Sequence, residues 1–404
     1  MRDPGARTAL VALVATLAIQ VFTALTSAAP AVLAPALAAD LAVTPKWIGV
    51  FVSLMYAGAM LGSLACGEFI ARYGAIRVSQ VCVLACAAGI GAVALLPASA
   101  VPVLAAAAFA MGIGYGPITA ASSEILVRTT PVDRMALTFS VKQTGVPAGI
   151  ALAGAALPGV ALLAGWRFAF VAVALVGVLV AAGAEPTRKS LDRRHAPAAA
   201  FSLAAVLAPL RTVMGSPGLR ELSLAGFAFA SVQVSLTSFL VTYLADVLQW
   251  SLVAAGLALT CATTSAVIGR IFWGVVADRW LAPTRTLALA AAVSAASGIA
   301  LAFAGPAWPA WTVLPLVAVY GATAIGWNGV QLSELARRAP AGQAGAVTGA
   351  SGFVTFGGVV AGPLVFAGLA ALAGGYRPGF LVCAAVSATA AAMLVGRRPR
   401  SAPT

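Results

Sequence analysis

The sequence predicts an all-α membrane protein with twelve transmembrane helices in two pseudo-symmetric six-helix bundles. Three observations predict this class: the composition, the number of long apolar stretches and an internal repeat. Of the 404 residues, 61% are hydrophobic and only 9% are charged, and the mean hydropathy is +1.00. Soluble domains have about 25% charged residues. The chain is therefore predicted to cross a lipid bilayer several times.

Apolar stretches that can cross about 30 Å of hydrocarbon occur twelve times. They cover residues 9–38, 47–71, 76–96, 101–127, 135–157, 166–184, 219–246, 251–277, 285–304, 311–335, 344–372 and 378–396. Residues 185–217 carry several arginines and prolines and are predicted to form a cytoplasmic loop with a short surface helix. The predicted domains are an N-terminal bundle (1–184), this central loop (185–217) and a C-terminal bundle (218–404). We expect the first stretch to be a retained helix and not a signal peptide.

The distribution of basic residues predicts the orientation. A net charge of +13 would favour nucleic-acid binding in a soluble chain, but here the charges lie in short runs between apolar stretches. If the N-terminus is cytoplasmic, nineteen of the 24 basic residues lie on the cytoplasmic side, and only Lys46, Arg167 and Arg377 lie outside. This bias predicts that both termini are cytoplasmic. The alanine- and arginine-rich composition favours a bacterial cytoplasmic (inner) membrane.

The two halves of the sequence repeat each other. At an offset of 207, Gly67 matches Gly274 and Arg72 matches Arg279; at an offset of 210, Glu124 matches Glu334, Arg128 matches Arg338, Thr138 matches Thr348, Arg167 matches Arg377 and Phe170 matches Phe380. Duplicated bundles of this kind form a binding site at their interface in many secondary transporters. The repeat therefore predicts two six-helix units related by an axis along the membrane normal.

Two short segments carry a resemblance to a known family. Residues 67–77 read GEFIARYGAIR, and residues 274–279 read GVVADR. Both resemble the repeated cytoplasmic loop signature of the major facilitator superfamily, and the likeness in span number and repeat covers nearly the whole chain. The resemblance implies alternating access by rocking of two bundles, and we expect a monomer. The first copy departs from the pattern at Ala71, where the second copy has Asp278, so we expect other charges to complete its cytoplasmic latch.

Glu124 and Glu334 are candidates for those charges. Each lies near the cytoplasmic end of a span, four residues before an arginine. They could carry protons, or they could form ion pairs that hold a cytoplasmic gate closed; we favour ion pairing, because the resemblance places such acids in the loop network. The predicted gating residues are Arg72, Glu124, Arg128, Asp278, Arg279, Glu334 and Arg338.

Lys142 lies inside the predicted fifth span. An ammonium at bilayer depth costs roughly 2.5–3.5 kcal/mol unless water or an anion meets it, so we expect Lys142 to face a cavity. On a helix, Thr138, Lys142, Gly145, Gly149 and Ala153 form one small, polar stripe, with Leu157 elsewhere. We expect this stripe to be a wall of a central passage.

Arg270 is the second cation inside a span, roughly 13 Å from the cytoplasmic end at Arg279. It shares a helix face with Gly274 and Ala277, while Ile268 and Ile271 turn away. The resemblance places the fifth and eighth spans across the bundle interface, so Lys142 and Arg270 are expected to approach one cavity.

No acidic residue lies at matching depth, so the two cations predict an anionic substrate. A guanidinium matches a carboxylate in bidentate fashion. Residues 269–279 also resemble the eighth helix of oxalate/formate and monocarboxylate transporters, which implies that Arg270 engages a substrate carboxylate. Both cations could instead be structural, with Arg270 bonded to backbone carbonyls and Lys142 tying helices together.

Further polar side chains lie on the helices expected to line the cavity. With the two cations, the predicted substrate-binding set is Lys142, Arg270, Gln20, Tyr115, Thr119, Gln233, Asn328 and Gln331. Each of the added residues could instead tie helices together.

The predicted function is secondary active transport of a small organic anion, a carboxylate, linked to protons; anion exchange without protons stays open. The alternative is a drug or metabolite efflux antiporter of the same fold, but that resemblance would place an arginine near Ala108 and a carboxylate in the first span, and neither is present. A receptor or an enzyme is disfavoured, because the sequence has no nucleophile–base pair, metal cluster or phosphate loop. The five cysteines lie in apolar stretches and the single histidine, His195, in a loop, so no metal or cofactor is expected. Small anions, protons and lipid are the expected partners, and nucleic acid is not.

Overall fold

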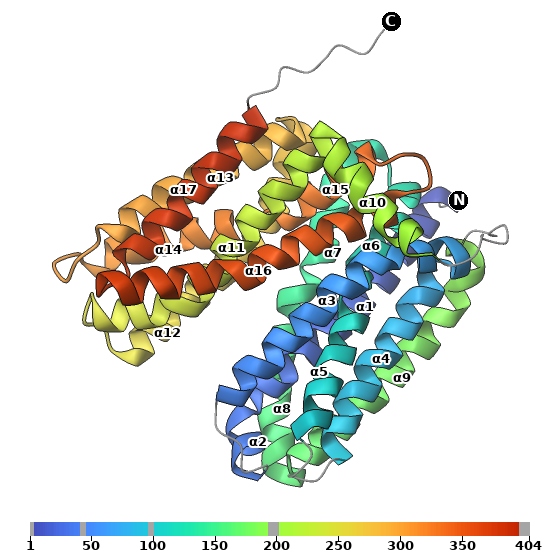
Figure 1. The fold of residues 1–404 in the computed structure, drawn as a ribbon, viewed down its shortest axis with the longest axis horizontal. Coiled ribbons are helices and arrows are strands. Elements are labelled where there is room, and N and C mark those ends of the chain that lie inside the picture. Colours follow the sequence, from blue (N-terminus) through green and yellow to red (C-terminus); the bar gives the residue numbers. More distant parts are fainter. Residues whose placement is uncertain (1–3, 41–45, 96–100, 193–201, 396–404) are drawn as a thin grey trace, which may run out of the picture. The chain divides into compact units, whose positions relative to one another are not determined.

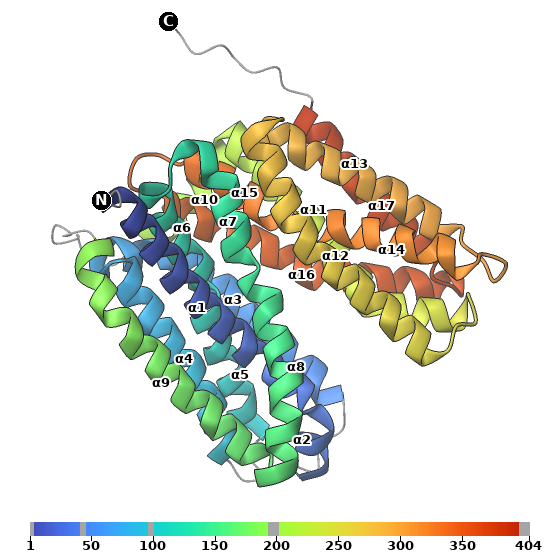
Figure 2. The same cartoon turned by 180° about the vertical axis from the view of Figure 1, so that it is seen from behind.

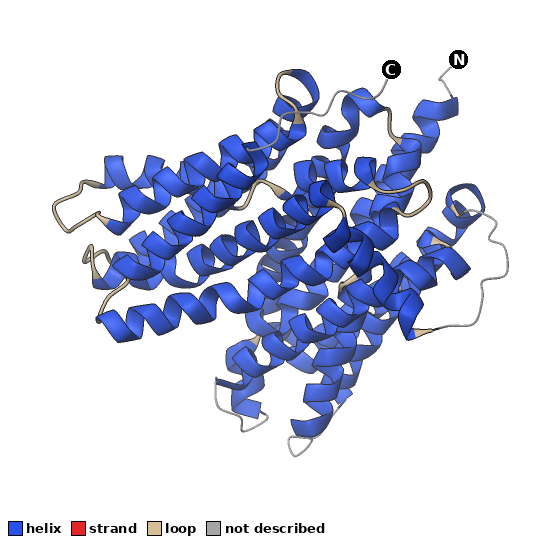
Figure 3. Cartoon of the chain, turned by 45° about the horizontal axis from the view of Figure 1, so that its top comes forward, coloured by secondary structure: helices blue, strands red, loops and turns tan. Residues whose placement is uncertain are grey.

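The computed structural model describes residues 4–40, 46–95, 101–192 and 202–395. In these ranges the regular secondary structure is helical, and no strand occurs among them (Figure 3). Twelve helical segments of the described ranges are long and apolar enough to cross a membrane. This number confirms the predicted all-α, twelve-span class.

The chain forms two compact units, whose helices are labelled in Figures 1 and 2. Unit 1 comprises Met1–Val132, Lys142–Ser216 and Leu335–Phe356, and unit 2 comprises Asp133–Val141, Pro217–Glu334 and Gly357–Thr404. Each unit therefore contains most of one predicted half of the chain and one short segment of the other half. These segments are 335–356 in unit 1 and 133–141 in unit 2.

Unit 1 is built mainly from the first half of the chain. Its described helices are α1 (Pro4–Val32), α2 (Ala34–Asp40), α3 (Lys46–Tyr73), α4 (Ala75–Leu95), α5 (Val101–Tyr115), α6 (Pro117–Thr129), α8 (Gly145–Ala164), α9 (Trp166–Leu191) and α10 (Leu203–Gly215).

Unit 2 contains all or part of the remaining helices. They are the short 3-10 helix η1 (Val132–Arg134), α7 (Met135–Gln143), α11 (Pro217–Asp246), α12 (Leu252–Arg279), α13 (Pro283–Ala302), α14 (Ala310–Ala324), α15 (Asn328–Arg338), α16 (Ala344–Ala373) and α17 (Arg377–Val395). Four of these elements are divided between the units: Val132 of η1, the end of α7, the end of α15 and the first part of α16, up to Phe356, belong to unit 1.

Three of the described spans are each divided into two helices, which the apolar pattern did not predict. The fourth span divides into α5 and α6 at Gly116, where Pro117 begins the second helix. The fifth divides into α7 and α8 at Thr144, and the tenth into α14 and α15 after Ala324. Gly116 (φ −55°, ψ −49°) and Thr144 (φ −64°, ψ −17°) keep helical backbone angles, so the fourth and fifth spans continue through these positions. The tenth span is interrupted by a turn at residues 325–327.

The same helix pairing occurs in both units, as the internal repeat predicts. In unit 1, α3 packs on α5 and α4 on α9; in unit 2, α12 packs on α14 and α13 on α17. The first pair of each unit approaches closely at a glycine. A Cβ added at Gly112 would lie 1.9 Å from the Met55 carbonyl oxygen, and one at Gly321 would lie 2.2 Å from that of Ala262. These glycines let two helix backbones touch.

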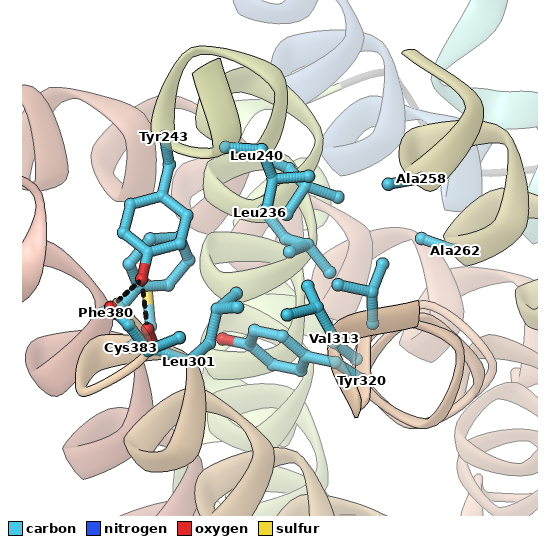
Figure 4. Packing of buried hydrophobic residues seen from close by; sticks show 14 of the residues in the cluster. Leu236, Leu240, Tyr243, Ala258, Ala262, Leu301, Val313, Tyr320, Phe380 and Cys383 are labelled. Carbon is cyan, nitrogen blue, oxygen red and sulfur yellow. Dashed lines mark hydrogen bonds between the residues drawn. The ribbon is translucent and has the colours of Figure 1, made fainter. Parts of the chain in front are cut away.

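The core of unit 2 is a cluster of apolar and aromatic side chains (Figure 4). Phe239 stacks on Phe366 at 4.4 Å, and Phe380 meets Phe366 edge-on at 5.1 Å. The Tyr243 hydroxyl donates to the carbonyl oxygens of Leu301 and Ala304, at the end of α13. The buried tyrosine is thus satisfied at its polar end, and it fixes α11 against α13.

The predicted surface helix of the central loop is present as α10. Ser202 caps it by accepting a hydrogen bond from the backbone N–H of Ala205 (3.1 Å), and α10 packs on α3. At the end of α9, Asp192 accepts from the backbone N–H of Ile76 (2.7 Å) at the start of α4. Gly74, between α3 and α4, has φ +89°, and a side chain there would strike Asp192. The start of the central loop is thereby fixed to unit 1.

Replacing Gly112 by alanine should lower the thermal stability of the protein, because the added methyl group overlaps the Met55 carbonyl and forces α5 away from α3. Overpacking of this kind costs about 1–3 kcal/mol, and thermal unfolding of the purified protein measures it. Gly154→Ala is the matched control, because nothing lies within 4 Å of a Cβ added there. Equal melting temperatures for the two variants would contradict the close packing.

Candidate functional site

Lys142 lies at the end of α7 and is almost completely buried, with 1% of its side chain exposed. Its Nζ donates to Oε1 of Gln20 (2.6 Å) on α1 and to Oε1 of Gln143 (3.2 Å). The same Gln20 oxygen accepts a longer hydrogen bond from Thr119 Oγ1 (3.5 Å) on α6. Three predicted site residues, Lys142, Gln20 and Thr119, therefore meet in unit 1. Gln143 was not predicted, although its place beside Lys142 in the span was a usable signal.

Close packing of α8 on α1 positions this group. A Cβ added at Gly145 would lie 3.1 Å from Gln20 Cβ, and one at Gly149 would lie 2.2 Å from the Val21 carbonyl oxygen. The prediction that Gly145 and Gly149 form a wall of an open passage is therefore wrong. Leu157 is also buried, although it was predicted to lie elsewhere. Small residues spaced by four favour direct helix contact, and this requirement explains the stripe.

Arg270 on α12 is 3% exposed. Its Nη2 donates to Oδ1 of Asn328 (3.5 Å) at the start of α15. Gly274 and Ala277 are buried with it, whereas Ile268 is 65% exposed. The predicted orientation of this face of α12 is confirmed.

Two more predicted residues of unit 2 lie near the break between α14 and α15. Gln233 on α11 accepts a hydrogen bond from Trp327 Nε1 (3.2 Å), and the Trp327 ring stacks on Phe229 at 5.1 Å. Gln331 donates from Nε2 to the carbonyl oxygen of Leu222 (2.9 Å). Gln331 therefore joins α15 to α11. This helix-joining role was the alternative to substrate binding for this residue.

Tyr115, the last residue of α5, lies in an aromatic group of unit 1. Its ring centroid is 6.3 Å from that of Phe356, and the ring centroid of Tyr56 is 5.9 Å from the same Phe356 ring. The group joins α3 and α5 to the part of α16 that belongs to unit 1.

Asp278 holds the start of α7 in unit 2. Its two carboxylate oxygens accept from the backbone N–H groups of Ala136 (2.9 Å) and Leu137 (2.8 Å). A carboxylate at this position satisfies N–H groups that have no partner within the helix and interacts favourably with the helix dipole. One turn further, Ser140 fits between two glycines: a Cβ at Gly274 or Gly329 would lie 2.8 or 2.2 Å from Ser140 Oγ. No sequence pattern indicated this contact, because it depends on the packing of α7 against α12 and α15.

Glu124 on α6 contacts the start of α16 in unit 1. It is 7% exposed, and its Oε2 accepts from the backbone N–H of Gly345 (3.0 Å) in the first turn of α16. Its Oε1 lies 3.7 Å from Nε of Arg128, so the predicted ion pair is present. Arg128 also donates from Nη2 to the carbonyl oxygen of Leu191 (2.9 Å), at the end of α9.

The remaining predicted gating residues lie at helix ends. Arg72 pairs with Glu68 at 3.3 Å, one turn earlier on α3. Arg279 is the last residue of α12. Glu334, 1% exposed, and Arg338 lie in the last turns of α15.

Comparison with known proteins settles the family. The sequence model of the Major Facilitator Superfamily matches residues 16–363. The chain belongs to this superfamily. It is a membrane transporter and not an enzyme. No curated protein sequence matches the chain significantly.

Solved structures with the same fold belong to several transporters. A variant of the fucose:proton symporter FucP of E. coli is 16% identical, with a TM-score of 0.77, and the match covers 96% of this chain and 98% of that one. The human organic anion transporter MFSD10 is 18% identical with a TM-score of 0.73, covering 97% and 100%. A bacterial homologue of the iron transporter ferroportin is 16% identical with a TM-score of 0.76, covering 95% and 98%. At these identities the likeness establishes the fold alone.

Replacing Asp278 by alanine should expose the N–H groups of Ala136 and Leu137 and loosen the first turn of α7. Loss of a helix cap costs about 0.5–2 kcal/mol. Hydrogen exchange read by mass spectrometry should therefore quicken in the peptide that contains Ala136. Asp133→Ala is the control, since Asp133 pairs with Arg134 at the surface. Unchanged exchange in the Asp278 variant would show that the cap contributes nothing.

Proposed function

We propose that the protein is a secondary active transporter of a small organic anion, a carboxylate, which it moves by alternating access in a proton-linked reaction. Family membership supports transport, and the contacts of Lys142 support the sign of the substrate charge. The proposed setting is a bacterial cytoplasmic membrane, with both termini in the cytoplasm and a monomer as the working unit.

The observation that carries the proposal is the kind of atom to which Lys142 donates. The Gln20 and Gln143 side chains meet the ammonium with amide oxygens, at 2.6 and 3.2 Å. An amide oxygen satisfies an N–H donor but brings no negative charge. A carboxylate in the same place forms a charge-assisted hydrogen bond, which is roughly twice as strong. A substrate anion is therefore a better partner for Lys142 than either amide.

Arg270 supports the same substrate class from unit 2. Its acceptor Asn328 is again an amide, and a guanidinium presents two parallel N–H groups that match a carboxylate. The resemblance of residues 269–279 to oxalate/formate and monocarboxylate transporters favours this role. We propose that both cations engage the substrate during the transport cycle. Thr119 and Tyr115 in unit 1, and Gln233 in unit 2, are the proposed orienting groups.

The proton can follow either of two routes. A carboxylate substrate can carry the proton itself, or a glutamate of the gate, Glu124 or Glu334, can carry it. Neither route requires a permanent carboxylate at mid-membrane depth, where burial of a charge is costly.

Thermal stability of the purified protein in the presence of small mono- and dicarboxylates tests the substrate class. Ligand binding to the folded state adds RT ln(1 + [L]/Kd), about 2.7 kcal/mol at 100-fold saturation. A carboxylate should raise the melting temperature of the parent, and Lys142→Ala and Arg270→Ala should each abolish that rise. Arg211→Ala, which removes an exposed cation on α10, should retain it. Stabilisation by neutral or cationic compounds alone would contradict the anion site and support the efflux alternative.

Replacing Gln20 by glutamate should abolish carboxylate binding while the protein stays folded. The change keeps the size of the side chain but puts a negative charge where Oε1 lies 2.6 Å from Lys142 Nζ, so the new carboxylate competes with a substrate carboxylate for the ammonium. The carboxylate-dependent rise in melting temperature should be lost. In Gln20→Met, which removes the acceptor without adding charge, the rise should remain on a less stable protein. Carboxylate binding at parental strength by Gln20→Glu would place the anion elsewhere.

A further inference from the structure

The two copies of the loop signature differ at one acidic position. The second copy has Asp278, which holds the first turn of α7 through two backbone N–H groups. The first copy has Ala71 at the matching place. At the repeat offset of 210, Met135 at the start of α7 corresponds to Gly345 in the first turn of α16. The helix that an acid at residue 71 would hold is therefore α16.

The starts of α7 and α16 each pack against the signature glycine of their unit. In unit 2, a Cβ added at Gly274 would lie 3.0 Å from Leu137 Cα. In unit 1, a Cβ added at the matching Gly67 would lie 3.0 Å from Ala346 Cα. Each signature glycine thus receives the first turn of the incoming helix. The geometry of docking is repeated within the chain, whereas the acid beside it is not.

A cavity adjoins Ala71, the residue that stands where the second copy has an acid. Ala71 lines a cavity of about 430 Å³ in unit 1. The start of α16 borders this cavity through Gln343 and Ala346, and α10 of the central loop borders it through Pro209. Glu124 lines the cavity from α6. The cavity has room for the side chain that Ala71 lacks.

We propose that Glu124 replaces the missing acid at residue 71 and is the residue that holds the start of α16 in unit 1. Its Oε2 accepts from the Gly345 N–H at 3.0 Å. Gly345 directly precedes residues 346 and 347, which match Ala136 and Leu137 at the offset of 210. Burial strengthens this contact, because a carboxylate shielded from water interacts more strongly with a helix N-terminus. The inference requires only that the protein is a transporter of this family, and it does not depend on the substrate.

We call the contact between Glu124 and the start of α16 the α16 latch. With Glu124 in place of an acid at residue 71, this latch contacts other helices than the Asp278 contact does. Asp278 lies on α12, and the start of α7 packs against this same helix. Glu124 lies on α6, whereas the start of α16 packs against α3. Arg128 joins Glu124 to the carbonyl oxygen of Leu191 (2.9 Å), at the start of the central loop. The α16 latch therefore connects the fourth span to the central loop, whereas the described contacts of Asp278 connect α12 to α7.

Cys66 is a native reporter of this latch. It is 1% exposed, its Sγ lies 3.9 Å from the Gly345 carbonyl oxygen, and a Cβ at Gly349 would lie 2.4 Å from Sγ. The first turns of α16 therefore cover the thiol. Modification of Cys66 by a membrane-permeant maleimide should require that this part of α16 leaves α3. Cys82 and Cys86, buried on α4, serve as internal references.

The experiment compares Glu124→Ala, the double variant Ala71→Asp/Glu124→Ala, and Glu68→Ala in membranes, with maleimide labelling read for each cysteine by mass spectrometry. Glu124→Ala should speed Cys66 labelling roughly tenfold, the factor expected for loss of one strong cap. The carboxylate introduced at residue 71 should return the rate toward that of the parent. Glu68→Ala removes another acid of the same cavity and should leave the rate unchanged.

Three results would overturn the proposal. The first is an unchanged Cys66 labelling rate in Glu124→Ala, and the second is a rise that Ala71→Asp does not reverse. The third is an equal rise in Glu68→Ala, because the effect would then come from the general charge of the cavity. If Glu124→Ala raises labelling at Cys82 and Cys86 as well, the fold is lost. The same comparison is then made with Glu124→Gln, which keeps the side-chain volume, and its result decides.

Discussion

A lipid environment offers no hydrogen bonds to the backbone, and this constraint determines most of the structure. The described spans are helical, and the glycines at close helix crossings allow backbones to touch without a polar gap. At several described helices a side chain satisfies an N–H group near the start of the helix, as Asp278 does for α7 and Glu124 does for α16. Charged residues are consequently concentrated at helix ends, where water and helix dipoles meet them. Lys142 and Arg270 lie within spans instead, and each donates to a neutral amide.

Under the proposed function, these two kinds of charge have different roles. The carboxylates at helix ends accept hydrogen bonds from backbone N–H groups and hold the starts of α7 and α16. The two cations inside the spans donate to side-chain amides, which we propose a substrate carboxylate replaces during the transport cycle.

Composition and apolar stretches predicted the number of spans, because about twenty consecutive apolar residues have almost no other stable arrangement. The face of α12 that carries Arg270 was also predictable, since helical periodicity decides it. The divisions at Gly116 and Thr144 were not predicted, although Pro117, which has no backbone N–H to donate within a helix, is visible in the sequence. The stripe of Gly145 and Gly149 was misinterpreted because small residues line cavities and close helix contacts equally well. Gln143 was overlooked, although its position beside Lys142 within the span was visible in the sequence.

The fifth span changes from unit 2 to unit 1 between Val141 and Lys142. Thr144 keeps helical backbone angles (φ −64°, ψ −17°), and its carbonyl oxygen accepts from the Ala148 N–H at 3.0 Å. Within α7, Met135–Val141 therefore belong to the unit of Asp278, and Lys142 belongs to the unit of its partner Gln20. A single helix thus forms a direct covalent link between the carboxylate contacts of unit 2 and the buried ammonium of unit 1.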